Sequence, residues 1–345
     1  GFRGLRNLGS TCFLSSVTQM FLHNPLMRSY FLSGGHAGAG AEQCSVRERK
    51  GACFSCEMDA LFAQIWGGNR RRLTKAEEAE AENHVADGLD SGPLSPTSLA
   101  GYAQQDAHEY FITALNMLHS STSGCREDGR CTCIVHTLFS GVLGSQIRCD
   151  RCENATLTLD PILDLSLDIH PEDQEGEGSP NPLLALGDCI DRYTREERLK
   201  GMNYTCGKCG YASKEVSKQM SIHRLPTVLH IQLKRFKHGY HGGEKLESPV
   251  SLPHVIDMTP YTTDGINARR RGGRMYNRYR LFGLVCHQGK MDTGHYTAYI
   301  IIRGQWYHFD DHMVRSASEA EVSKANGYVL PVRREEGKDI KMNQI

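Results

Sequence analysis

The sequence has no apolar run near the roughly 20 residues that a membrane-spanning helix needs. It does not open with a signal-peptide pattern, although it begins at Gly1 rather than Met, which leaves room for an upstream domain or targeting segment. It also has no charge excess, because Lys plus Arg and Asp plus Glu number 40 each. No overall field therefore favours nucleic acid, an acidic substrate or a membrane, and charge-driven recognition must be local.

Cysteine is plentiful instead. The 13 cysteines are odd in number, the chain is 345 residues long, and most cysteines fall in short pairs with histidines nearby. This pattern favours zinc in a reducing compartment over a secreted disulfide framework. The length fits one large domain with insertions as well as it fits two domains.

A polar, glycine-containing turn from Asn7 to Cys12 precedes an apolar pattern of helical spacing that Asn24 and Pro25 end. Cys12 is thus placed at a helix N-terminus, where unpaired N–H groups and the helix dipole favour a thiolate and predict a lowered thiol pKa. The Asn7 carboxamide lies on the same turn and can direct an N–H at an oxyanion forming over Cys12. The alternative is a buried structural cysteine.

A second polar cluster lies near the C-terminus, where two strands flank the short turn at Arg303 and Gly304. A two-residue loop places Ile302 opposite Gln305, and alternation then puts Asp310 on the face of His295 and Asp311 on the other face. A histidine oriented by a carboxylate is the expected partner of a cysteine nucleophile. The alternative is a cross-strand hydrogen bond on a polar sheet face.

The remaining periodicity is helical at first and alternating from Thr137 onward. We expect an amphipathic helix after Asp106, whose carboxylate is either functional or an ordinary helix-start residue. Leucines between Leu157 and Ile169 predict half-exposed antiparallel strands, and a helix is expected from about Leu183 to Leu199. The segment 74–96 is expected to be a solvated helix and linker, and the segments 171–182 and 269–274 are expected to be charged loops.

Three sets of Cys and His have the number and spacing of closed, four-ligand structural zinc sites. The pairs Cys149-x-x-Cys152 and Cys206-x-x-Cys209 give the strongest signal, with a redox pair or free thiols as the alternative. The other two sets are His119, Cys131, Cys133 and His136, and His36, Cys44, Cys53 and Cys56. Cys125, Cys189 and Cys286 have no expected role.

Taken in order, the segments 7–12, 104–109, 225–236, 294–299 and 306–311 resemble the ubiquitin-specific proteases over nearly the whole chain. The resemblance implies an α+β, papain-like fold with a helical thumb (1–136), zinc-ribbon fingers (137–222), an antiparallel-β palm (223–335) and a tail (336–345). It implies cleavage after the C-terminal glycine of ubiquitin. By matching position, the nucleophile, general base, orienting residue and oxyanion donor are Cys12, His295, Asp310 and Asn7. Asp311 matches a position near the oxyanion, and Asp106 and Tyr296 match positions that line the channel for the ubiquitin tail.

The two zinc sets of the thumb are similar to those in the deubiquitinase subunit of the SAGA transcriptional coactivator. That likeness implies a nuclear chromatin regulator that removes ubiquitin from histone H2B on nucleosomes and needs small adaptor subunits for full activity. Members of that group usually carry a zinc-finger module before the catalytic domain, so we expect this chain to be a piece of such a protein or a divergent member.

Two other functions stay open. One is a catalytically weak scaffold that binds ubiquitin, against which intact Cys12 and His295 argue, and the other is a protease for another ubiquitin-like modifier. The arginine clusters 70–72 and 269–271 either meet DNA or the acidic nucleosome surface, or are solvated loops.

Overall fold

The computed structural model describes residues 3–7, 9–36, 44–67, 106–122, 131–170, 184–239, 242–271, 277–290 and 293–335. The expected linker at 74–96, the acidic loop at 171–182, the arginine cluster at 70–72 and Cys125 lie outside the described residues. Within the described ranges, no helix is both long and apolar enough to cross a membrane.

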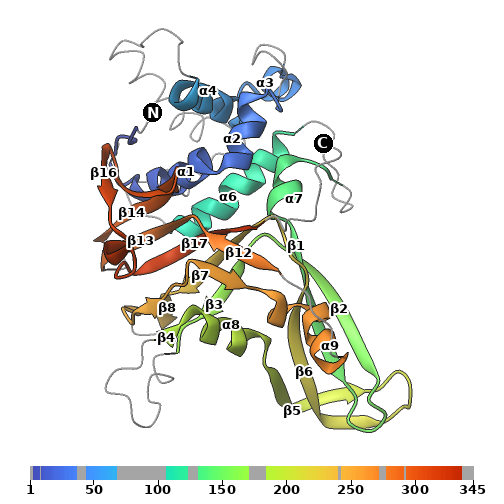
Figure 1. Ribbon diagram of the computed structural model, residues 1–345. Coiled ribbons are helices and arrows are strands. Elements are labelled where there is room, and N and C mark those ends of the chain that lie inside the picture. The colour runs from blue at the N-terminus through green and yellow to red at the C-terminus, as the bar shows by residue number, and fades with distance from the viewer. Residues whose placement is uncertain are drawn as a thin grey trace. The chain divides into compact units, whose positions relative to one another are not determined.

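The chain forms two compact units (Figure 1). Unit 1 comprises Gly1–Leu138, Phe236–Lys245 and Phe282–Leu330, and unit 2 comprises Phe139–Arg235, Leu246–Leu281 and Pro331–Ile345. The expected division into thumb, fingers and palm stays a prediction.

Unit 1 begins with a helix that is buried along nearly its whole length. This is α1 (Cys12–His23), and Asn24 ends it and then caps α2 (Pro25–Leu32) by accepting hydrogen bonds from two backbone N–H groups. Proline at the first position of α2 completes this break, as the sequence predicts. The other helices of this unit are α3 (Ser45–Lys50), α4 (Phe54–Trp66), α6 (Ala107–Ser120), α7 (Ile134–Phe139, whose last residue belongs to unit 2) and α10 (Glu319–Val322).

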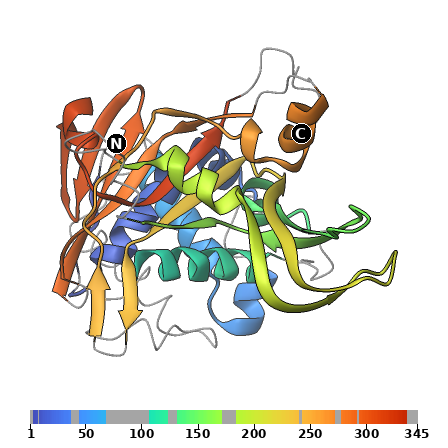
Figure 2. The same cartoon turned by 90° about the horizontal axis from the view of Figure 1, so that it is seen from below.

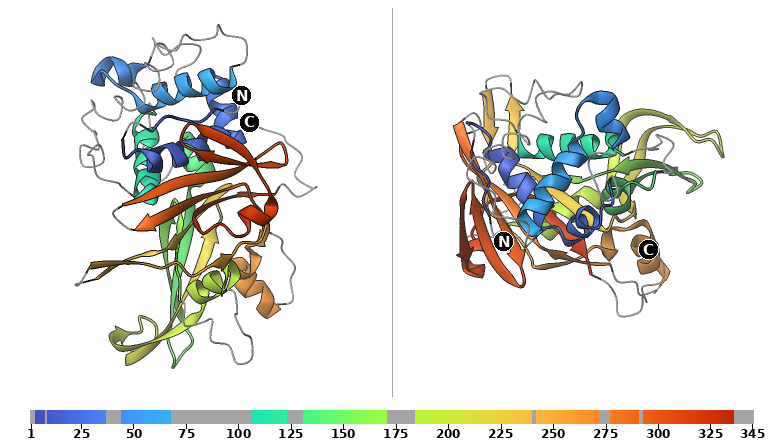
Figure 3. Two further views of the ribbon diagram at one scale, coloured as in Figure 1. Left: turned by 90° about the vertical axis from the view of Figure 1, so that its left-hand side faces the viewer. Right: turned by 90° about the horizontal axis from the view of Figure 1, so that it is seen from above.

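The strands of unit 1 form an antiparallel sheet against which α1 packs, mainly through β14 (Figure 3). In order across the sheet, the strands are the first residues of β17 (Gly327–Arg334), then β13 (Gly283–Lys290), β14 (Thr293–Ile302), β15 (Gln305–Asp310) and β16 (Met313–Ala317). A separate hairpin, β8 (Phe236–Gly239) with β9 (Gly242–Lys245), is the pair of yellow-orange arrows at the lower left of Figure 2.

The hairpin of β14 and β15 has the expected register. Arg303 and Gly304 both have positive φ angles, 53° and 82°, as a two-residue hairpin turn requires. Ile302 therefore pairs with Gln305, and Ala298 with Phe309. This register brings the two halves of the predicted His-Asp pair together.

Unit 2 contains an antiparallel sheet in the order β2-β1-β6-β5. Its strands are β1 (Gly141–Arg148), β2 (Ala155–Ile162), β5 (Glu196–Thr205) and β6 (Ala212–Arg224). The remaining elements are β3 (Leu165–Asp168), β4 (Leu184–Ala185), α8 (Leu186–Thr194), β7 (Val228–Lys234), β10 (Val250–Ser251), β11 (Val255–Asp257), η3 (Thr259–Tyr261), α9 (Thr263–Arg271) and β12 (Arg278–Leu281).

Three expectations for unit 2 are wrong. β3 pairs in parallel with β7, where Leu165 lies opposite Ile231, 66 residues later, and not in an antiparallel hairpin with a neighbouring strand. The helix expected to reach Leu199 ends at Thr194, since Glu196 onward pairs with β6. The arginines 269–271 continue α9 instead of forming a loop.

Candidate active site and metal centres

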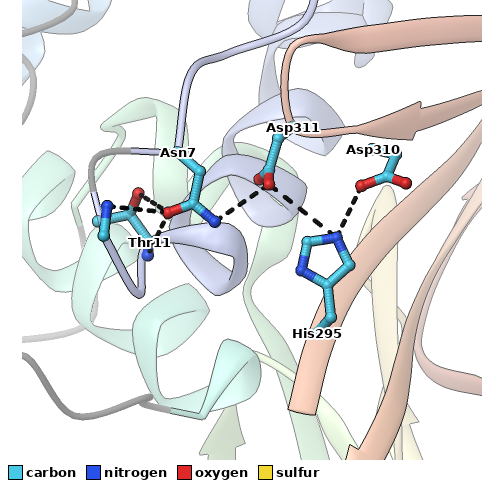
Figure 4. Close-up of polar contacts among 6 residues, drawn as sticks. Asn7, Thr11, His295, Asp310 and Asp311 are labelled. Carbon is cyan, nitrogen blue, oxygen red and sulfur yellow. Dashed lines mark hydrogen bonds and ion pairs between the residues drawn. The ribbon is translucent and has the colours of Figure 1, made fainter. Parts of the chain in front are cut away.

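The turn before α1 is organised by the side chain of Asn7 (Figure 4). Its Oδ1 accepts hydrogen bonds from the backbone N–H groups of Gly9 (3.0 Å) and Thr11 (3.1 Å) and from the Thr11 hydroxyl (3.2 Å). Its Nδ2 donates to Oδ2 of Asp311 at 3.0 Å. Cys12 is the first residue of the helix that this turn starts.

The predicted lowering of the Cys12 pKa is wrong for the free chain. Cys12 is 1% exposed, and this burial raises the pKa of its thiol above the ordinary value, with a smaller contribution in the same direction from the Asp311 carboxylate. The backbone N–H groups of Tyr296, Phe13 and Cys12 act in the opposite direction, but they do not outweigh burial. The contact with the Tyr296 N–H also places Cys12 beside the residue that follows His295.

His295 lies between two carboxylates (Figure 4). Its Nε2 is 2.7 Å from Oδ1 of Asp310, which confirms the pair expected from the hairpin register. The same nitrogen is 4.0 Å from Oδ2 of Asp311, so the expectation that Asp311 faces away is wrong. β15 ends at Asp310, and Asp311 has a positive φ of 48°, so strand alternation does not extend to it.

The segment that carries Asn7 is held on the turn that carries Asp311, a contact that sequence reasoning missed. The Leu5 N–H donates to the Asp311 carbonyl at 2.9 Å. A Cβ on Gly4 would lie 2.3 Å from the same oxygen, so only glycine allows this approach. From α1, the buried Gln19 side chain donates to the Arg3 carbonyl at 2.9 Å. The glycine three residues before Asn7 was the available signal.

Asp106 and Tyr296 come together at the start of α6. Oδ1 of Asp106 caps the helix by accepting from the N–H groups of His108 (2.8 Å) and Glu109 (3.1 Å), so Asp106 is a helix-start residue, one of the two alternatives expected. Oδ2 accepts from the Tyr328 hydroxyl at 2.5 Å, a partner that lies more than 200 residues away and that sequence reasoning missed. Burial, and then the Asp106 carboxylate, raise the pKa of the Tyr296 hydroxyl, which accepts from the Ala107 N–H.

The four cysteines of the strongest metal set converge in unit 2. The Sγ atoms of Cys149 and Cys209 are 3.8 Å apart, and those of Cys152 and Cys206 are 3.7 Å apart. Four sulfurs at about 2.3 Å from a tetrahedral zinc ion are separated by about 3.8 Å, so the set fits zinc. Each pair lies on a tight turn closed by a backbone hydrogen bond, from Glu153 to Cys149 and from Gly210 to Cys206, both 2.9 Å.

The two other sets converge in unit 1, and the ligand atoms of each lie within 4.8 Å of one another. Nε2 of His36 is 3.2 to 3.4 Å from all three sulfurs of its set. In the other set, Nδ1 of His119 is 3.5 Å from Sγ of Cys133 and 3.9 Å from Sγ of Cys131, and Nδ1 of His136 is 3.2 Å from Sγ of Cys133. Cys189 and Cys286 are buried and belong to none of the sets.

Three features together are typical of cysteine-type hydrolases. They are a cysteine at a helix start, a histidine that directly precedes the strand residue whose N–H contacts this cysteine, and a carboxylate that meets the histidine across a hairpin. The chain belongs to the ubiquitin carboxyl-terminal hydrolases, whose family model matches residues 3–331. Members of this family are cysteine-type deubiquitinases.

Among curated relatives, ubiquitin carboxyl-terminal hydrolase 8 of Saccharomyces cerevisiae is 36% identical over 96% of this chain and 70% of its own length. Human ubiquitin carboxyl-terminal hydrolase 27 is 33% identical over 96% of this chain and 78% of its own length. Ubiquitin C-terminal hydrolase 22 of Arabidopsis thaliana is also 33% identical over 96% of this chain, but the match spans only 63% of that protein.

Solved structures show the same fold. The SAGA Ubp8/Sgf11/Sus1/Sgf73 DUB module bound to ubiquitin aldehyde matches with a TM-score of 0.82 and 35% identity, over 97% of this chain and 70% of the matched chain. A complex of this module with monoubiquitin matches with a TM-score of 0.80 and 34% identity, over 97% and 69% of the two chains. The fold is therefore the expected mixed helix and sheet fold of the ubiquitin-specific proteases.

Proposed function

We propose that this chain hydrolyses the bond after the C-terminal glycine of ubiquitin, with Cys12 as the nucleophile and His295 as the general base and acid. The observation that carries this proposal is the 2.7 Å contact between His295 and Asp310. His295 lies on β14, the strand against which the Cys12 helix α1 mainly packs. Family membership supports the reaction, and these contacts support the assignment of residues.

In the proposed mechanism, the hydrogen bonds of His295 assign a role to each ring nitrogen. Because Nε2 of His295 faces Asp310, Nδ1 is the ring nitrogen left to take the Cys12 proton as sulfur attacks the glycyl carbonyl. Asp310 fixes the ring and stabilises the imidazolium that forms. His295 then protonates the leaving lysine amine and activates water, which hydrolyses the thioester.

We assign stabilisation of the oxyanion to the Asn7 carboxamide. One of its two N–H bonds already points to Asp311. An amide nitrogen has a second N–H bond, which remains for the substrate oxygen. Asp106 and Tyr296 are assigned to the channel for the ubiquitin tail. A carboxylate there complements the basic residues of that tail, and the tyrosine narrows the passage for its two glycines.

Zinc is assigned to all three four-ligand sets, where it would crosslink the segments that supply the ligands. Each set supplies four protein ligands, which leaves no position for a reacting water, so the metal would be structural. We also retain the proposed thumb (1–136), fingers (137–222), palm (223–335) and tail (336–345).

For the biological setting, we propose monoubiquitinated histone H2B on nucleosomes as the substrate, adaptor subunits of a SAGA-type module as partners and the nucleus as the location. The support is the similarity to a SAGA module in which the matched chain is assembled with Sgf11, Sus1 and Sgf73. A comparison of reconstituted ubiquitinated nucleosomes with free diubiquitin, each with and without such adaptors, tests it. Preference for diubiquitin in both states would overturn the histone assignment.

The catalytic proposal is tested with ubiquitin that carries a C-terminal electrophile. The wild-type chain is expected to form a covalent adduct at Cys12, and Cys12→Ala is expected to bind the probe without reacting. A Cys189→Ser variant is the matched control, because that thiol is also buried but lies outside every proposed site. Binding without an adduct in the wild type, both alone and with adaptor subunits, would instead support the scaffold function.

A further inference from the structure

The hairpin segment that carries His295 extends beyond the body of the sheet of unit 1. On one side, β13 pairs with β17 at Val285 with Val329 and at Cys286 with Gly327. On the other side, β15 pairs with β14 only from Ala298 onward. Within the described residues, no third strand thus pairs with this hairpin from Gln288 onward, where Gln288 pairs with His295. Two-stranded ribbons are marginally stable in water by themselves.

A lysine from another hairpin occupies the open edge of this ribbon. Nζ of Lys245 donates to the carbonyl oxygens of His287 and Gly289, both at 3.0 Å. These residues flank Gln288, the direct partner of His295. Carbonyls two residues apart on a strand point the same way, so one ammonium group satisfies the acceptors that a further strand would otherwise pair.

The contact is reinforced by an aromatic residue directly opposite Lys245. Phe236 pairs with Lys245 across the β8–β9 hairpin, and its ring lies edge-on to the His287 ring with centroids 5.2 Å apart. The His287 ring in turn lies 4.6 Å from that of Tyr296, the neighbour of His295. Because β8 and β9 form a sheet of their own, side chains rather than a ladder connect the two hairpins here.

We propose that Lys245 is a positioning residue for the reaction: its ammonium group clamps the β13–β14 ribbon so that His295 is held at the correct place beside Cys12. This inference rests on the proposed role of His295 as the general base. Lys245 touches neither substrate nor reacting atoms in this role, and it acts through the two carbonyls and the strand pair between Gln288 and His295.

The test compares Lys245→Met, which keeps the length and apolar stem of the side chain but has no donor, with Lys245→Arg, which keeps donors. Lys218→Met is the matched control, since the contact of Lys218 is a 3.8 Å surface ion pair with Glu197 on the sheet of unit 2. Steady-state hydrolysis of a fluorogenic ubiquitin amide is expected to show kcat lowered about 10- to 100-fold in Lys245→Met, with KM nearly unchanged. Lys245→Arg is expected to keep most of the activity and Lys218→Met all of it.

A second readout separates positioning from a merely structural role. Alkylation of Cys12 by iodoacetamide, followed by peptide mass spectrometry as a function of pH, reports the thiolate without any ubiquitin. A nearby imidazolium favours the thiolate, so a displaced His295 is expected to move the alkylation profile of Lys245→Met to higher pH. If Lys245 only stabilises the fold, its loss lowers the melting temperature while kcat per folded molecule and the alkylation profile stay as in the wild type, and the proposal is overturned.

Should Lys245→Met fail to fold, hydrogen exchange of the wild-type chain in low urea decides the matter. The backbone amides of 236–239, 242–245 and 287–290 are expected to exchange through one shared opening reaction. Exchange of the two hairpins through independent opening reactions would overturn the proposed role of Lys245. The two proposals fail distinguishably. If Cys12 of the wild type is not labelled in the ubiquitin-probe experiment, the proposed catalytic function is overturned. If the wild type is labelled and Lys245→Met has wild-type activity, only the proposed role of Lys245 is overturned.

Discussion

Asn7 and Asp311 are joined by a hydrogen bond of 3.0 Å that links the turn before the proposed nucleophile to the turn after the carboxylate of the His-Asp pair. The orientation of the amide is fixed, because its oxygen already accepts from the backbone N–H groups of Gly9 and Thr11. Asp311 is held in turn by its carbonyl, which accepts from the Leu5 N–H. One side chain therefore sets the geometry on both sides of the proposed oxyanion site.

Substitution of Asn7 by Ala should lower kcat by about 10²- to 10³-fold, the usual cost of a lost oxyanion donor, with little change in KM. Asn7→Asp should be at least as damaging, because it keeps the acceptor for the turn but places a second carboxylate opposite Asp311. Steady-state kinetics with a fluorogenic ubiquitin substrate measure both. Thr11→Val is the control, since it removes the hydroxyl that donates to the Asn7 oxygen at 3.2 Å but leaves the carboxamide N–H groups in place, and a comparable loss of kcat in this variant would speak against the donor role.

The two carboxylates beside His295 should not be equivalent. Asp310 is 2.7 Å from Nε2 and Asp311 is 4.0 Å from it, so Asp310→Asn should lower kcat on the order of 10²- to 10⁴-fold by leaving the imidazole in the wrong tautomer or orientation. Asp311→Asn should cost less, because the amide can still meet Asn7. Parallel measurements of kcat and KM decide the ranking, and a larger loss for Asp311→Asn would reverse it.

The parts of the site that follow from short-range geometry could be predicted from the sequence. The two-residue turn at Arg303 and Gly304 fixes the hairpin register, and alternation then brings His295 to Asp310. The same rule failed for Asp311 because alternation holds only within a strand, and β15 ends one residue earlier. The four-ligand sets were also predictable, since their spacing reflects the ligand geometry of zinc itself.

Other failures share a different cause, which is contact between segments distant in the chain. The helix start at Cys12 predicts a lowered thiol pKa, but packing of α1 on β14 buries the sulfur, and burial outweighs the helix end. Likewise, nothing near Asp106 in the sequence indicates Tyr328, and nothing near His295 indicates Lys245. Such partners depend on the tertiary fold, which short-range patterns do not encode.

Zinc should be present at three equivalents per chain if every four-ligand set is occupied. Cys206→Ser should lose one equivalent, measured by elemental analysis, because a tetrahedral thiolate site with three ligands binds far more weakly. Cys189→Ser, a buried cysteine outside the sets, should lose none. Chelation of all zinc should lower the melting temperature and the hydrolytic activity together, and full activity in a metal-free chain would rule out the structural role.

His23 should make unit 1 sensitive to acid. The side chain is buried, with its ring between those of Trp66 (5.2 Å) and Phe309 (4.9 Å) and its Nδ1 2.9 Å from the Gln19 carbonyl oxygen. Burial, with help from the positive charge of Arg28, lowers its pKa from 6.5 to about 4. The folded chain therefore keeps this imidazole neutral at a pH where the unfolded chain binds a proton.

The sign of the effect follows from that difference in protons bound. Above pH 6.5 neither state binds a proton at His23, so its contribution to the free energy of unfolding is fully present, and it falls as the pH drops from 6.5 toward 4, by about 3 kcal/mol in all. His23→Phe should remove this loss, whereas substitution of the exposed His223 should not. Urea unfolding at pH 7 and pH 4 can be followed by tryptophan fluorescence, because both tryptophans, Trp66 and Trp306, lie in unit 1. An equal loss of stability in wild type and His23→Phe would show that another group carries the acid sensitivity.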